Sequence, residues 1–413
     1  MIAAGTVNIT TMSRCCTVAP NTPEPNILVV AINADGTPGA TATTGADGKA
    51  TLAVTEGASV TAVYPEDTDH DNDLQTFVGV KPADNLTFGD AYYSVQPPPG
   101  ADGQMIVNWP AVANATRYAA INTCTTAEST TLTVTLSLVA YCQRATSPVV
   151  LVAFDSSSQI IASAYLPAAD TAVGANIPAN AVTWVTQAPG NAAVSISGLD
   201  AVVDYVSFFA SGDYPIYGYG YNYGSSGMAP KAGAASTTLS IPSTAPYKYS
   251  RVELSRNGNF GRQLHYKGGV PPWAMTPGTL PWIDGLPLVS FSQRRAIWFE
   301  TPGNYDAAVL FLDWQRSDGK FSHYFNWTIV VPPKVSDLRF PTPPAELEAF
   351  LPDAMDQVGH ELTLVDLSSA ASYDAARALP VWRIANAQSA VSYGEEPSAG
   401  IATEGEGFST FAD

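Results

Sequence analysis

The chain has 413 residues, of which 46% are hydrophobic and only 14% are charged, and its formal net charge is −18. This length predicts two to four domains, and the apolar content is high enough for each to bury a core of its own. The acidic balance argues against a nucleic-acid partner and against an anionic membrane surface, because both require a basic face on the protein.

The N-terminal third carries the clearest local signals. Residues 1–20 predict an arm or an edge strand. Between residues 27 and 65, short alternating segments are separated by dipeptides typical of tight turns, in which glycine accepts a positive φ. These dipeptides are Asp35-Gly36, Asp47-Gly48 and Glu56-Gly57. Four short strands at this spacing predict a β-sandwich or a β-barrel.

The order of these segments resembles known families. An apolar strand is followed by Asp35-Gly36-x-Pro38, a Thr-rich strand and Asp47-Gly48-x-Ala50-x-Leu52. The pattern resembles the carboxypeptidase-regulatory-like domains and is similar to bacterial immunoglobulin-like surface modules. The resemblance covers about the first ninety residues and does not separate the two families. It implies a prealbumin-like or immunoglobulin-like sandwich, usually non-catalytic, in a secreted or surface protein.

A stiff Pro-rich linker at residues 97–100 separates the first predicted domain (1–93) from a second (100–185). The second domain opens with a strand that bears Trp109, and Tyr118 follows on the next strand. This arrangement resembles a fibronectin type III module, in which the Trp packs between the two sheets. The resemblance implies another β-sandwich over about ninety residues.

Two further regions complete the predicted architecture. Residues 186–335 predict a β-rich domain with a Tyr/Gly loop. Residues 336–413 predict a C-terminal extension with a short helix, last strands at 361–367 and 381–384, and a loosely held acidic tail from Ser392. The predicted fold class is all-β, with tandem Ig-like/prealbumin-like β-sandwich domains and little helix. We expect these domains to form a monomeric rod.

An acidic loop supplies the chemistry of a metal site. Calcium takes several hard oxygen ligands, and carboxylates at alternate positions could provide them. These carboxylates are Asp67, Asp69, Asp71 and Asp73. The loop lacks the central Gly and the closing Glu of a full calcium loop, so a solvated connection between strands is the competing interpretation. Calcium is the cofactor that this hypothesis adds.

A Tyr/Gly loop at residues 213–227 is the second candidate site. Tyrosines alternate with glycines there, which places flat amphipathic rings on an adaptable backbone suited to recognising sugars or proteins. The alternative is a loop in which the rings cover their own sheet. The tyrosines are Tyr214, Tyr217, Tyr219, Tyr221 and Tyr223.

The cysteines and the N-terminus bear on the compartment. Cys124 and Cys142 flank a strand-rich run, and we predict a disulfide between them in an oxidising compartment. The N-terminus lacks the basic start and apolar core of a signal peptide, so either the protein stays inside the cell or a leader lies upstream. The domain types favour export. No run of about 18 apolar residues occurs, so no transmembrane segment is predicted.

No nucleophile elbow, zinc-binding helix, P-loop or dinucleotide fingerprint occurs. The favoured hypothesis is therefore a non-catalytic secreted or cell-surface protein with a structural or adhesion-like role, binding protein or glycan. The alternative is a carbohydrate-active exoenzyme whose site lies in residues 190–335, with the other sandwiches as accessories. This alternative requires at least two of four carboxylates to converge in a cleft. The four are Glu253, Glu300, Asp306 and Asp313.

Overall fold

The computed structural model shows a chain built almost entirely of β-strands. It describes residues 4–13, 22–65, 71–89, 103–122, 125–138, 146–212, 221–256, 261–340, 344–385 and 398–410, apart from short gaps at 171, 173, 246–247, 278, 286, 292, 318–319, 354–355, 368–369 and 371. Helix in the described residues is confined to α1 (Tyr373–Arg377), α2 (Val381–Ala385) and the 3₁₀ turns η2 (Ala179–Ala181) and η3 (Ala345–Phe350). The predicted all-β class of tandem sandwiches is therefore confirmed. None of the described helices has the length and apolar character needed to cross a membrane.

The first module is a sandwich of two sheets, ordered β4-β1-β7 and β3-β2-β5-β6. Its strands are β1 (Ala4–Thr11), β2 (Leu28–Ile32), β3 (Pro38–Thr43), β4 (Lys49–Thr55), β5 (Ala58–Tyr64), β6 (Asp71–Val80) and β7 (Asn85–Phe88). The N-terminal arm is not an edge strand, because β1 lies between antiparallel β4 and parallel β7. Gly48 has a φ of 67°, and a Cβ there would lie 2.5 Å from the carbonyl oxygen of Thr11. Only glycine fits this turn without strain.

The second module packs the sheet β10-β9-β12-β13-β15 against β11-β8-β14. Its strands are β8 (Gly103–Asn108), β9 (Arg117–Asn122), β10 (Thr126–Ser129), β11 (Thr133–Leu138), β12 (Thr146–Phe154), β13 (Ile160–Asp170), β14 (Asn176–Ile177) and β15 (Val185–Thr186). Trp109 is buried in the core between these sheets. Its ring lies 5.5 Å from that of Tyr118 on β9, so the two aromatics pack together as their spacing suggests.

The third module packs β18-β17-β20-β21 against β19-β16-β22 around the buried Trp273 and Phe208. Its strands are β16 (Ala192–Ser197), β17 (Val203–Gly212), β18 (Tyr221–Met228), β19 (Ala234–Leu239), β20 (Tyr249–Arg256), β21 (Gly261–Gly268) and β22 (Trp273–Met275).

The fourth module packs β23-β24-β27 against the strands β26-β25-β28-β29. Its strands are β23 (Leu288–Ser290), β24 (Arg295–Ile297), β25 (Ala307–Ser317), β26 (Ser322–Val331), β27 (Asp337–Arg339), β28 (Gln357–Leu367) and β29 (Ser398–Thr410). Two expectations for the C-terminal region differ from this arrangement. Residues 381–384 are helical in α2, because Val381 and Ile384 lie three apart and are both buried on one side. Part of the tail pairs as β29 between β21 and β28.

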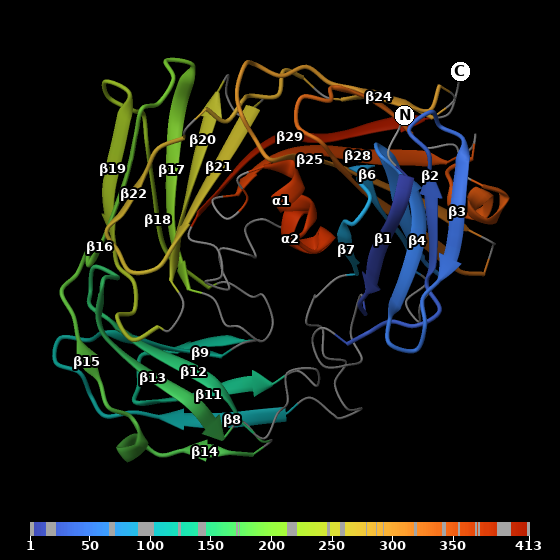
Figure 1. Cartoon of the computed structure of the whole chain (residues 1–413). Coiled ribbons are helices and arrows are strands. Elements are labelled where there is room, and N and C mark those ends of the chain that lie inside the picture. Colours follow the sequence, from blue (N-terminus) through green and yellow to red (C-terminus); the bar gives the residue numbers. More distant parts are fainter. Residues whose placement is uncertain are drawn as a thin grey trace.

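The four modules follow one another around a closed path, as Figure 1 shows, and the expected rod is not found. The path closes where β6 of the first module pairs in parallel with β26 of the fourth. One sheet of twelve strands results, in the order β18-β17-β20-β21-β29-β28-β25-β26-β6-β5-β2-β3. An unpaired edge strand exposes backbone donors and acceptors, so two modules with bare edges gain by joining them.

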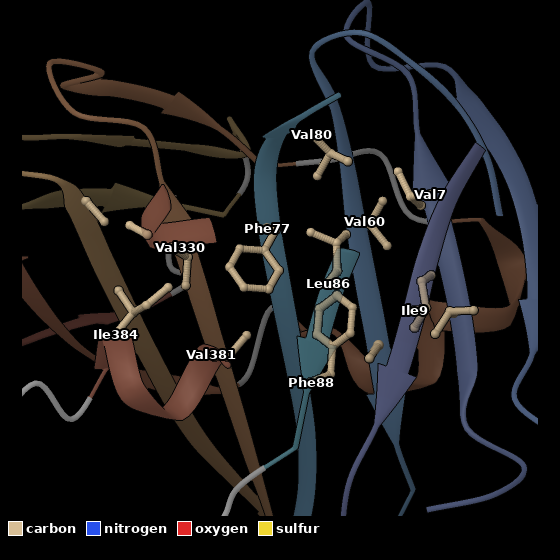
Figure 2. Packing of buried hydrophobic residues seen from close by; sticks show 14 of the residues in the cluster. Val7, Ile9, Val60, Phe77, Val80, Leu86, Phe88, Val330, Val381 and Ile384 are labelled. Atoms are coloured by element: carbon tan, nitrogen blue, oxygen red, sulfur yellow. The ribbon is translucent and has the colours of Figure 1, made fainter. Parts of the chain in front are cut away.

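The core of the first module continues across this junction. Figure 2 shows Phe77 of β6 facing Phe88 of β7, with Val330 of β26 and the α2 residues Val381 and Ile384 beside them. The Phe77 and Phe88 rings meet edge to face at 5.4 Å. Because α2 buries its apolar side against both modules, the C-terminal helices belong to the same core as the N-terminal strands.

Candidate functional site

The structure places part of the Tyr/Gly loop. Tyr214, Tyr217 and Tyr219 lie outside the described residues. Tyr221 is the first residue of β18. Tyr223 is half-buried and packs against the cores of both the second and third modules. The one tyrosine whose side chain is described therefore helps to join two modules, and a ligand-binding role for the loop stays a prediction.

The acidic run is also described only in part. Asp67 and Asp69 lie outside the described residues, whereas Asp71 and Asp73 begin β6. The Asp73 carboxylate accepts a hydrogen bond of 2.9 Å from the side-chain amide of Gln75. Within the described parts of the chain, no group of three or more His, Cys, Asp or Glu is arranged to hold a metal ion. The calcium hypothesis stays a prediction.

Neither cysteine of the predicted bridge, Cys124 or Cys142, lies within the described residues. The predicted disulfide therefore also stays a prediction.

The four carboxylates of the enzyme hypothesis occupy different places. Asp306 is buried, accepts a 2.8 Å hydrogen bond from the backbone of Leu367, and has its pKa raised by burial to about 6. Glu300 accepts a hydrogen bond of 2.9 Å from the Tyr305 hydroxyl.

Glu253 lies on β20, which three strands separate from β25 in the long sheet. The registers place Glu253 level with Ala307, six residues before Asp313 on β25. At about 4.8 Å per strand and about 3.3 Å per residue, Glu253 is therefore well over about 19 Å from Asp313. Asp313 lines a hollow on the surface of the fourth module. The lining of this hollow includes none of the other three carboxylates, and the enzyme hypothesis stays a prediction.

The hollow has a volume of about 390 Å³ and lies over β25, β26 and β28. Alternate residues along each strand share a face of a sheet, and six such residues line it. They are Asp313 and Gln315 of β25, Tyr324 and Asn326 of β26, and Gln357 and Gly359 of β28. The register places Asp313 opposite Asn326, and Gln315 opposite Tyr324. A block of polar side chains and one tyrosine ring therefore stands on neighbouring strands.

Gly359 makes room for the Asp313 carboxylate. The two residues are directly paired between β28 and β25, and a Cβ on Gly359 would collide with the Asp313 carboxylate. The absence of a side chain at residue 359 thus lets that carboxylate lie across β28. His360, the next residue, faces the core, where its Nε2 lies 3.0 Å from the carbonyl oxygen of Pro287 and burial lowers its pKa.

The floor of the hollow is held rigidly from below. Trp314 and Phe325 also border the hollow. Both alternate with the six residues above, are buried, and stack with an interplanar angle of 5°. The guanidinium of Arg316 lies 4.9 Å from the Phe325 ring centroid, and its Nε donates a 2.8 Å hydrogen bond to Asp356. Packing of this kind limits side-chain motion, which favours a preformed site.

The lining residues other than Asp313 were not identified from the sequence. A usable signal was present, because the Asp-Gly turn at 318–319 predicts the β25–β26 hairpin. Pairing outward from Ser317 and Ser322 places Gln315 opposite Tyr324 and Asp313 opposite Asn326. The lining residues of β28 lie about 45 residues further along the chain, and no local sequence pattern predicts their position beside β25.

No protein-family model matches the chain, and no curated protein matches it. Among solved structures it is similar to the Bacillus anthracis TIE protein, at 11% identity and a TM-score of 0.15, over 66% of this chain and 49% of that one. It is also similar to a DUF3823 family protein from Parabacteroides merdae, at 9% identity and a TM-score of 0.16, over 62% and 94% of the two chains. The chain thus spans about half the length of the TIE protein, and TM-scores this low support no inference about function.

Proposed function

We propose that this protein is a non-catalytic binding protein of the secreted or cell-surface type, which contacts a protein or a glycan through the hollow over β25, β26 and β28. Tandem sandwiches joined into one closed body suit a rigid support better than a flexible tether. The tight-turn patterns of the first module, with their resemblance to surface modules, favour export. The low content of charged residues, 14%, agrees with that class.

The observation that carries the proposal is the chemistry of the hollow. Its lining combines one tyrosine ring, 46% exposed, with side-chain amides and a single carboxylate, and the buried Trp314 and Phe325 also border it. A few convergent polar groups beside an exposed aromatic ring on a rigid floor are typical of a recognition site. Hydrolysis of a glycosidic bond needs two carboxylates in the same cleft. The described lining of the hollow contains a single carboxylate, that of Asp313.

The test uses the intact chain, labelled with a fluorophore, on arrays of glycans and of extracellular proteins. We expect saturable binding to members of at least one array. Chromogenic glycosides are assayed in parallel, and we expect no turnover. Absence of binding on both arrays would contradict the binding role. Turnover lost in Asp313→Asn would instead establish the exoenzyme alternative.

A further inference from the structure

The arrangement of the hollow points to a class of ligand, and this inference rests on the proposed binding function. We infer that the hollow is a saccharide subsite. In it the ring of Tyr324 stacks on one face of a sugar ring. Asp313, Gln315, Asn326 and Gln357 bond its hydroxyl groups.

The geometry of the block matches a sugar ring. Asp313 and Asn326 are direct cross-strand partners, and Gln315 and Tyr324 are the next pair on the same face. Paired side chains stand about 5 Å apart across strands and about 7 Å apart along a strand. One six-membered sugar ring covers such a block, and a hollow of about 390 Å³ has room for one or two of them.

The chemistry of the lining favours hydroxyl groups over other ligands. Amide side chains both donate and accept hydrogen bonds, and a carboxylate accepts them. This combination suits hydroxyl groups, which also donate and accept. Anions are disfavoured, because the described lining contains no Lys or Arg. A lipid or other apolar ligand is disfavoured because four of the six lining residues that share this face carry an amide or a carboxylate.

The neighbouring strand adds a preference among sugars. Asp71 and Asp73 of β6 are paired with Tyr324 and Asn326, so they stand next to the block on its β6 side. Their carboxylates, together with Asp313 and the net charge of −18, repel a sugar carboxylate. The expected ligands are therefore neutral or amino sugars, and sialic or uronic acids are disfavoured.

The experiment compares the intact protein with matched variants on a glycan array, followed by titration calorimetry with the oligosaccharide that binds best. Tyr324→Ala removes the stacking ring, and we expect affinity to fall about tenfold or more. Gln315→Leu keeps the shape but removes the amide, and we expect a loss of similar size. Tyr205→Ala is the control, since Tyr205 is also 46% exposed but lies on β17 of the third module.

Each outcome decides the inference. Binding of neutral or amino sugars that Tyr324→Ala weakens and Tyr205→Ala leaves intact supports it. Glycan binding that is unchanged in Tyr324→Ala overturns it, because the sugar then binds elsewhere. Binding on the protein array without any on the glycan array overturns it too, while the broader binding role survives. Circular dichroism on every variant separates a lost contact from a lost fold.

Discussion

Arg377 of α1 joins the C-terminal helices to the first module, and its replacement tests how the closed path is held together. Its side chain is 2% exposed. It donates hydrogen bonds to Asp84 (3.1 Å), to the carbonyl oxygen of Gly79 (3.0 Å) and to Asp374 (3.1 Å). Its Nε lies 2.8 Å from the second Asp84 oxygen without the alignment of a hydrogen bond. The guanidinium also lies 5.1 Å from the ring centroid of Tyr373.

Arg377→Met keeps most of the apolar stem and removes the charge. Removing one partner of a buried ion pair costs about 3–5 kcal/mol, because the remaining charge and carbonyl lose their bonds. The Asp84 side chain is 21% exposed and regains some water, so we expect the lower end, about 3 kcal/mol. Lys81→Met is the matched control. The Lys81 pair with Asp374 is 45% and 56% exposed, and its loss should cost about 0.5 kcal/mol or less.

Hydrogen exchange measured by mass spectrometry is the suitable assay, because a chain of several modules need not unfold in one step. In Arg377→Met, we expect faster exchange in peptides from β6, β7 and α1. Peptides from the second module should remain unchanged. Equal effects of Arg377→Met and Lys81→Met would refute the reasoning, as would acceleration spread evenly over the whole chain.

Three further predictions concern acidity, the hollow and calcium. Burial raises the pKa of Asp306 from 3.8 to about 6, so folding favours the protonated carboxyl group. The stability that this proton contributes is fully present below pH 4 and is lost as pH rises through 6. The Asp306→Asn side chain can still accept the hydrogen bond from the Leu367 N–H. In chemical denaturation, we expect this variant to be more stable than the parent at pH 7.5, by at most about 3 kcal/mol, and equally stable near pH 3. A difference in stability that does not change with pH would contradict this. Gly359→Ala should displace the Asp313 carboxylate and weaken ligand binding about tenfold with an unchanged circular dichroism spectrum, and undiminished affinity would count against it. The calcium hypothesis for residues 67–73 predicts a lower melting temperature in excess chelator, and an unchanged midpoint rejects it.

Local chemistry in the sequence determined the strands and turns. The Asp47 carboxylate accepts a hydrogen bond from the Lys49 backbone and Gly48 takes a positive φ, so this reversal is encoded within three residues. The Asp-Gly turn likewise encoded the β25–β26 hairpin, and with it half of the hollow. Such signals act over a few residues, which is why the all-β class was predictable.

Tertiary structure decided which edges meet. The sequence of β6 does not predict its pairing with the parallel strand β26, about 250 residues later. Any unpaired edge strand exposes the same backbone donors and acceptors. The segment 381–384 was predicted as a strand. It became helical because only a helix sets Val381 and Ile384 against the shared core. The hollow arose in the same way, since β28 brings Gly359 beside Asp313 only once the long sheet has formed.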